Sequence, residues 1–263
     1  LVYSKLNYNQ QELFVNPAFA GSQDMFSATI DFQKQWMEIE KSPSIQRLQA
    51  HMPIASDKVG LGLTLQNESF GVTRNFSLST HYAYRIPLKR GVLSLGLQLG
   101  FVTSQERYSE LHISTPDPMF SENTKQMWGF STGVGAYYSD SNYYVGLSIP
   151  YLIDNSLAEG KTKLANKIDF DKMPFYLAAG YVFSTNSPIR IKPAAMLSYS
   201  GEREFGYNVN LTGYYNNNFW LGALMRYRKE AGFFAGINIL DYVNLTYNYT
   251  FGYGELLEYV GRT

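Results

Sequence analysis

The chain contains no cysteine among its 263 residues, which excludes both a disulfide framework and a thiolate metal site. It has 22 basic and 22 acidic residues, so its charge gives no reason to expect nucleic acid as a partner. No stretch approaches the roughly 18 to 20 apolar residues that a transmembrane helix requires. Charged residues make up only 17% of the chain, against about 25% in an ordinary soluble domain. Such a chain must arrange its apolar surface in another way.

Residues suited to catalysis are also scarce. The three histidines, His51, His81 and His112, lack the spacing of paired metal ligands. Nothing singles out a serine beside a histidine as a nucleophile with its base. The glycines of 129–138 lie within strand-like alternation and open no helix, so they form no dinucleotide fingerprint and instead leave room inside a barrel or let strands bend. We therefore expect no enzyme, no cofactor and no metal.

The sequence is rich in two-residue alternation, which is typical of strands with two different faces. In 93–101, for example, four leucines and a phenylalanine alternate with serine, glycine and glutamine. Most predicted strands have the roughly nine to eleven residues that a tilted strand needs to cross a bilayer. The alternation predicts thirteen strands, near 25–33, 45–53, 58–67, 74–87, 91–104, 126–138, 142–150, 174–185, 189–200, 205–215, 219–228, 231–239 and 243–251.

The two faces of these strands differ from those of a soluble sheet. Arg74, at the first position of 74–87, is the one charged residue on the apolar face of the predicted strands, and the opposite face is mostly Gly, Ser, Thr, Asn and Gln. Charge concentrates instead in connections such as 105–125 and 155–172. This pattern indicates an inside-out protein, with apolar side chains facing lipid and small polar ones facing inward.

Connection lengths alternate along the chain. The even connections are short, at 54–57, 88–90, 139–142, 185–188, 216–218 and 240–242, and the odd ones are usually longer, at 34–44, 68–73, 105–125, 151–173, 201–204 and 228–230. Outer-membrane barrels have short periplasmic turns and longer outer loops. Aromatic residues gather beside three short turns, as in an interfacial girdle, although cross-strand pairing in an ordinary sheet would give the same pattern. We predict an all-β transmembrane antiparallel barrel in a bacterial outer membrane, with its N-terminus in the periplasm.

The chain resembles the PorP/SprF family of type IX secretion system membrane proteins over nearly its whole length. Matching stretches include 58–71, 79–88, 92–101 and 243–251. The most specific part is an N-terminal motif followed by a Gln-Trp pair: Asn16, Pro17, Ala18, Phe19, Ala20 and Gly21, then Gln35 and Trp36. The resemblance implies a non-enzymatic outer-membrane protein that helps to secrete or attach surface proteins, in gliding bacteria particular adhesins. Its implied partners are type IX translocon components and the C-terminal domain of a secreted adhesin.

Strand number raises a further expectation. An antiparallel barrel with both termini on one side needs an even number of strands, and thirteen are counted. The family normally has another strand after a segment like 254–263, so we expect about fourteen, with the last one missing from this chain unless one strand is miscounted. Residues 25–263 form the barrel in this interpretation, and residues 1–24 are an N-terminal periplasmic segment that either plugs the barrel mouth or packs beneath it.

The barrel interior is the candidate site. Five basic residues fall on inward strand positions, against Asp31 as the clear inward acid: Arg47, Arg85, Arg190, Lys192 and Arg226. They are either scattered cations that pair with acids of loops or of the N-terminal segment, or an electropositive interior that holds an acidic segment. The expected partner-contact surfaces are the N-terminal segment and the loops 105–125 and 151–173, because binding function tends to reside on loops of a rigid scaffold. A diffusion channel or small-molecule transporter, or a soluble all-β binding protein, remains the alternative.

Overall fold

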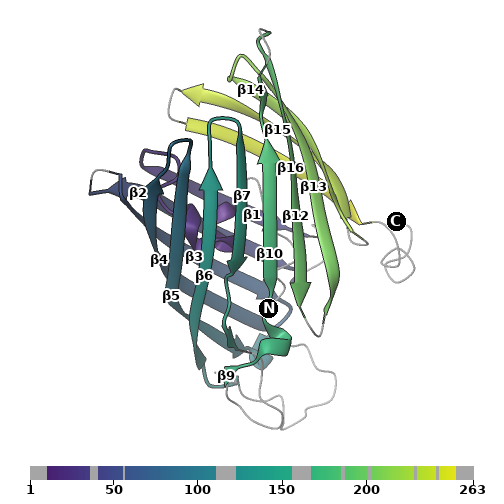
Figure 1. Cartoon of the computed structure of the whole chain (residues 1–263). Helices are drawn as coiled ribbons and strands as arrows, with labels where there is room; N and C mark the ends of the chain where they lie inside the picture. The colour runs from purple at the N-terminus through teal and green to yellow at the C-terminus, as the bar shows by residue number, and fades with distance from the viewer. Residues whose placement is uncertain are drawn as a thin grey trace.

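The computed structural model describes residues 11–35, 41–55, 57–110, 123–155, 167–184, 187–200, 203–227, 230–240 and 243–252. The described part is mostly strand, and nearly all of these strands belong to one large antiparallel sheet (Figure 1). The four short helical segments are α1 (Glu12–Val15), η3 (Pro17–Phe19), η4 (Tyr108–Glu110) and η6 (Phe170–Lys172). Within these ranges, no helix is both long and apolar enough to cross a membrane.

Each strand of the large sheet pairs with the next one along its path, which is β1-β2-β3-β4-β5-β6-β7-β10-β12-β13-β14-β15-β16. A fourteenth strand, β11, pairs with β12 off this path, and β8 (Ile153–Asp154) pairs with β9 (Lys167–Ile168) separately. The bounds are β1 Ser27–Lys34, β2 Ser44–Ile54, β3 Val59–Phe70, β4 Thr73–Pro87, β5 Val92–Glu106, β6 Met127–Ser139, β7 Tyr143–Ile149, β10 Phe175–Tyr181, β11 Phe183–Ser184, β12 Ile189–Ser200, β13 Arg203–Tyr215, β14 Phe219–Arg226, β15 Glu230–Leu240 and β16 Val243–Gly252.

The thirteen predicted strands are confirmed, each within a few residues of its predicted bounds. The one difference concerns the predicted strand 174–185, which is divided into β10 and β11. The division falls at Val182, whose backbone N–H donates to the carbonyl oxygen of Asn142 at 2.6 Å. The fourteen strands of the sheet therefore include β11, which is a short continuation of β10.

Burial confirms the inside-out arrangement of the two faces. On β5, Leu95 and Leu99 are 49% and 55% exposed, whereas the alternating Ser94 and Gln98 are 2% and 3% exposed. The same contrast runs along the other strands, since exposed large apolar residues alternate with buried polar ones. The exposed face of a soluble sheet is normally polar, whereas the exposed face of a membrane barrel is apolar because it faces lipid.

The short turns use backbone conformations that few residues adopt easily. Asn216 and Asn217 have φ of 47° and 60°, and asparagine tolerates the left-handed region better than most residues. Gly91 has φ of 70°, and a Cβ there would lie 2.3 Å from the carbonyl oxygen of Ser139. These tight connections fix the register of the hairpins and mark one end of the sheet, termed the short-turn end; the other is the long-loop end.

The sheet curls round so that β1 and β16 are its two edges (Figure 1). Within the described residues, these two strands are not hydrogen-bonded to each other. All twelve pairings along the path are antiparallel, so β1 and β16 point the same way. A further antiparallel strand between them would complete a barrel; the strand expected after 254–263 lies outside the described residues.

A charged substitution on the outer face tests which face of the sheet points towards lipid. Leu99 lies at the middle of β5 and faces outward, so we expect Leu99→Arg to lower the free energy of unfolding in lipid vesicles by about 2–4 kcal/mol. The matched control is Thr246→Arg, at an inward-facing position of β16 where the charge meets the interior. Urea unfolding in vesicles measures both. Equal losses for the two variants would contradict the assignment of faces.

Candidate functional site

Residues 11–21 lie on the inner, polar face of the sheet. The helices α1 and η3 contact β3, β4, β5 and β6, and Figure 1 shows them in purple within the curl of the sheet. Leu13 and Ala18 are fully buried, and Val15 is 2% exposed. The segment that precedes β1 therefore supplies apolar packing to an otherwise polar inner wall.

Five glycines of the inner wall make this close approach feasible: Gly60, Gly62, Gly96, Gly135 and Gly146, here termed the glycine bed. A Cβ on Gly60 would lie 1.9 Å from the carbonyl oxygen of Ala20, and one on Gly96 would lie 2.1 Å from the amide nitrogen of Ala18. No side chain fits at such distances, so the backbones meet directly. The glycine bed is thus shaped to the N-terminal segment.

Asn16 is the main polar anchor of the segment. Its side-chain Nδ2 donates to the carbonyl oxygen of Ala136 on β6 at 3.0 Å. Its Oδ1 accepts from the backbone N–H of Ala18 at 2.9 Å and so caps the start of η3. A Cβ on Gly135 would lie 2.1 Å from this same oxygen, so the glycine leaves the space that the asparagine side chain occupies.

Two further hydrogen bonds join the segment to the wall. Ser148 Oγ on β7 donates to the carbonyl oxygen of Val15 at 2.8 Å, and the backbone N–H of Gly21 donates to Nδ1 of His51 at 3.1 Å. An imidazole nitrogen accepts only when it carries no proton, so this bond needs the Nδ1 position of His51 to be unprotonated. The ring of Phe19 packs edge-on against His51, with 5.3 Å between the centroids.

Glu12 is the ionisable group of the segment nearest the β12 wall. Burial raises its pKa from 4.5 to about 7, and the positive charge of Lys192 opposes the rise. Lys192 Nζ itself lies 5.2 Å from the ring centroid of Tyr144. Because the pKa is raised in the docked state, the docked segment holds a proton that a released segment would lose. The contribution of Glu12 to docking is therefore full at low pH and is lost as the pH rises from about 4.5 to about 7.

The five inward basic residues do not form a single cluster. Arg47 and Arg226 lie at the long-loop end, close enough for their charges to interact, whereas Arg85, Arg190 and Lys192 lie near the short turns. A strand keeps its side chains in order along its length, so inward positions near opposite ends cannot meet.

Acids and polar groups accompany these basic residues. Arg47 forms an ion pair with Asp31 at 3.0 Å, and Arg226 pairs with Glu230. Arg85 pairs with Asp24 of the N-terminal segment and donates to the carbonyl oxygen of Asp57 at 3.2 Å. Arg190 donates to the side chain of Asn217. The interior thus has separate, largely compensated charges rather than one positive field.

Other predicted site residues are only partly described. The motif from Asn16 to Gly21 lies on the glycine bed, as above. Gln35 follows β1, and its backbone N–H donates to the carbonyl oxygen of Pro43 at 3.0 Å, but Trp36 lies outside the described residues. Residues 111–122 and 156–166 of the two long loops also lie outside them. Within the described part, no group of three or more His, Asp or Glu is placed to hold a metal ion.

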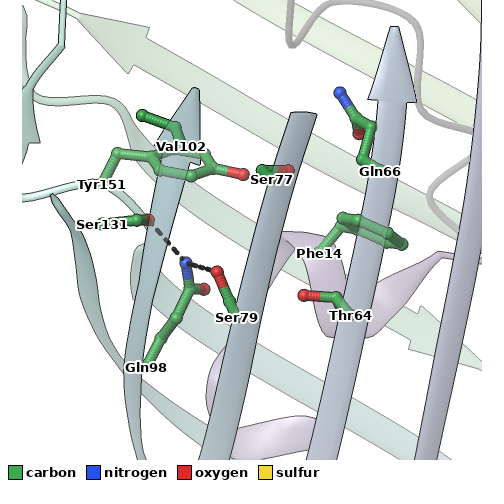
Figure 2. Close-up of a pocket in the computed structure, with 9 residues that line it drawn as sticks. All are labelled: Phe14, Thr64, Gln66, Ser77, Ser79, Gln98, Val102, Ser131 and Tyr151. Carbon is green, nitrogen blue, oxygen red and sulfur yellow. Dashed lines mark hydrogen bonds between the residues drawn. The ribbon is translucent and has the colours of Figure 1, made fainter. Parts of the chain in front are cut away.

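A pocket opens on the inner wall on the long-loop side of α1 (Figure 2). It is a small hollow, partly open to solvent, and none of its lining residues is charged. Gln98 Nε2 donates to Ser79 Oγ at 3.3 Å and to Ser131 Oγ at 3.1 Å. We term it the hydroxyl pocket; it is lined by Phe14, Thr64, Gln66, Ser77, Ser79, Gln98, Val102, Ser131 and Tyr151.

The sequence predicted only that the glycines of 129–138, which include Gly135, leave room inside a barrel or let strands bend; it did not predict the rest of the glycine bed, Glu12 or the hydroxyl pocket. The signal for the bed was present, because Gly60, Gly62 and Gly96 occupy inward positions near the short-turn ends of β3 and β5. An inward glycine is equally compatible with a bend in the strand, so this signal needs the packed segment before it becomes specific.

A family model described as type IX secretion system membrane protein PorP/SprF matches residues 2–263. No curated protein matches the chain. The family match covers the N-terminal motif, the glycine bed and every strand of the sheet, so it confirms the resemblance seen in the sequence.

Adding one methyl group to the glycine bed tests the docking of the segment. We expect Gly96→Ala to displace residues 11–21, because its Cβ would lie 2.1 Å from the amide nitrogen of Ala18. Overpacking of about 1–3 kcal/mol corresponds to protease cleavage within the segment that is about fivefold to a hundredfold faster. The control is Gly213→Ala, whose nearest neighbour would be the carbonyl oxygen of Leu221 at 3.8 Å. Unchanged protection in Gly96→Ala would show that the segment is not docked there.

Removing the carboxylate of Glu12 tests how much its buried charge weakens docking of the segment. We expect Glu12→Gln to dock more strongly than the wild type above about pH 7, because the buried charge is gone. The gain is on the order of 1 kcal/mol, since the side chain remains partly exposed. The measurement is protease cleavage of the segment between about pH 4.5 and 8. The wild type should lose protection towards pH 7 relative to the variant; parallel profiles would refute the role of Glu12.

Proposed function

The chain belongs to the PorP/SprF family of type IX secretion system membrane proteins, and from this premise we propose that it is a non-enzymatic outer-membrane barrel that assists secretion or surface attachment of a partner adhesin. In this proposal the barrel binds the adhesin's C-terminal domain and associates with components of the type IX translocon. Residues 1–24 are its periplasmic plug, and residues 25–263 are its barrel.

The placement in the outer membrane rests on the wall of the sheet. Apolar side chains cover its outer face, and the inner face is polar, as in barrels of that membrane. The periplasmic orientation of the N-terminus rests on the short turns, because such barrels have their short connections on the periplasmic side. The segment before β1 packs beside Gly60 and Gly96, which lie near that end of β3 and β5.

The observation that carries the proposed role is the N-terminal segment on the inner wall. Its backbone and the side chains of Leu13 and Asn16 fill space that five glycines leave. Four hydrogen bonds or ion pairs hold it between Val15 and Asp24. A barrel whose own chain occupies the inner wall at one end is better suited to holding a partner than to free diffusion of solutes. This arrangement favours a binding scaffold over a diffusion channel.

Recovery of partners from native membranes tests the proposed role. We expect the tagged barrel, extracted in mild detergent, to retain type IX translocon components and a secreted surface adhesin. Removal of the adhesin's C-terminal domain should abolish recovery of the adhesin and leave the translocon components in place. An untagged strain provides the control for non-specific recovery. Absence of both kinds of partner would count against the role.

Conductance separates the scaffold from the channel. In planar bilayers the wild type should conduct poorly, and the Gly96→Ala variant, with its segment displaced, should conduct more. Gly213→Ala should behave like the wild type, because its added methyl group meets no close neighbour. A large, steady conductance of the wild type would favour the diffusion channel instead.

A further inference from the structure

We propose that the outer face of β1–β4, at its long-loop end, binds the headgroup of a membrane lipid that carries both phosphate and sugar hydroxyl groups. The site is termed the rim patch, and its residues are Lys34, Ser44, Gln46, Asn67, Ser69 and Arg74. The inference rests on the proposed placement of the barrel in the outer membrane, and it does not depend on the adhesin role.

Strand register brings these residues together in two rows of the outer face. The row nearest the long loops crosses four neighbouring strands and consists of Lys34, Ser44, Ser69 and Arg74. Two residues further along each strand, on the same face, the second row consists of Phe32, Gln46, Asn67 and Phe76. The third row is wholly apolar and consists of Ile30, Leu48, Leu65 and Leu78. The outer face therefore changes from apolar to cationic within two steps of about 7 Å along the strands.

The charge of this outer face has one sign. Lys34 is exposed at the end of β1, and Arg74 shares the outward face of β4 with Phe76. The two acids of β1–β4 face inward: Asp31 pairs with Arg47, and Glu68 is buried. The strands thus present two positive charges and no negative one on this part of the outer face, which is complementary to an anionic headgroup.

The two basic side chains are suited to phosphate. The Nη1 of Arg74 donates to the carbonyl oxygens of Gly71 at 2.7 Å and Thr73 at 3.2 Å, which holds the guanidinium beside the β3–β4 turn. A guanidinium can bind phosphate through two parallel N–H groups, and a lysine ammonium binds it as a point charge. Lys34 and Arg74 are three strand spacings apart, about 14 Å, so a disaccharide-sized headgroup can contact both.

A polar notch separates the two basic residues. Phe32 and Phe76, which flank it, are 77% and 37% exposed, as expected for side chains that face lipid. Between them the exposed amides of Gln46 and Asn67 are joined only by a long hydrogen bond of 3.5 Å. Amides at the edge of the hydrocarbon need polar partners, and the hydroxyl groups of a sugar provide both donors and acceptors. The notch therefore favours a headgroup that has hydroxyl groups as well as phosphate.

The position of the rim patch favours a lipid over a protein as its occupant. The third row faces hydrocarbon, so the two rows above it lie where the headgroups of the surrounding lipids are. A lipid meets this surface without displacing anything, whereas a partner protein would first have to displace the lipids. A partner protein is an outcome that the test distinguishes.

Native mass spectrometry of the purified full-length chain in detergent tests the inference. The probes are lipid A, which has phosphates on a disaccharide, phosphatidylglycerol, which has phosphate without sugar, and digalactosyl diglyceride, which has sugar without phosphate. We expect lipid A to bind about fivefold or more tightly than either other lipid. An excess of inorganic phosphate should not displace it. Equal binding of the three lipids, or displacement by inorganic phosphate, would overturn the inference.

Charge removal locates the site. The double variant Lys34→Gln/Arg74→Gln should bind lipid A about twentyfold to thirtyfold more weakly, because each basic residue near an anionic headgroup contributes about fivefold. The matched control is Lys89→Gln/Arg90→Gln, which removes the same charge from a short turn at the opposite end of the sheet. It should bind lipid A as the wild type does. Unchanged binding in the first variant, or an equal loss in the control, would contradict the proposed site.

Substitutions in the notch test its preference for sugar and do not depend on the charge variants. Gln46→Leu and Asn67→Leu should each weaken binding of lipid A about twofold to tenfold, the loss expected for one hydrogen bond, and leave phosphatidylglycerol unchanged. Heat-modified gel mobility checks that each variant is folded, and either notch variant suffices if another variant is not. Folded notch variants that bind lipid A like the wild type would refute the role of the notch.

A pull-down from native membranes separates this inference from the proposed function. Loss of the adhesin or the translocon components in Lys34→Gln/Arg74→Gln, with lipid A binding unchanged, would show a protein contact and overturn the inference. Recovery of those partners by a wild type without preference for lipid A would overturn the inference and leave the role intact. Preference for lipid A without recovery of any partner would overturn the role and leave the rim patch as a lipid site.

Discussion

Lipid offers no hydrogen bonds to a peptide backbone, and this constraint determines the rest of the molecule. Strands that cross a membrane must satisfy one another's N–H and C=O groups in a continuous ladder. Twelve antiparallel pairings provide that ladder from β1 to β16. The ladder fixes alternate side chains outward and inward, so the apolar residues face lipid and the interior receives serines, glycines, amides and a few charges. The interior is thereby polar whether or not a partner uses it.

The small polar residues of the interior leave space inside the sheet. The short-turn end of the wall and the part nearer the long loops fill this space in different ways. Near the short turns, Gly60 and Gly96 let the backbone of the N-terminal segment lie directly on the sheet. Further along, the inward residues gain side chains, and the wall turns from a bed for the protein's own backbone into a pocket with hydroxyl and amide groups. At the long-loop end, ion pairs such as Arg47 with Asp31 complete the gradient.

The fold could be predicted from the sequence because a strand has a two-residue period and a bilayer sets its length. Every strand bound came from alternation, and the turns followed from what lay between. The site was less predictable. Alternation tells that Arg85 and Arg47 both face inward, but a cluster also depends on height along the strand. The position of each arginine along its strand could be read from the sequence. Arg85 comes three residues before a short turn, and Arg47 lies near the long-loop end of β2. The docking of residues 11–21 could not be predicted, because contacts between an N-terminal segment and a distant wall produce no periodic pattern in the sequence.

Because Phe14 belongs to the N-terminal segment and also forms the floor of the hydroxyl pocket, the two features are thermodynamically linked. Any change that favours the docked position of Phe14 also favours the shape of this part of the wall, because coupling free energies are reciprocal. The burial of Glu12 reduces the contribution of this side chain to docking as the pH rises towards 7, so its protonation is coupled to the pocket through the position of Phe14.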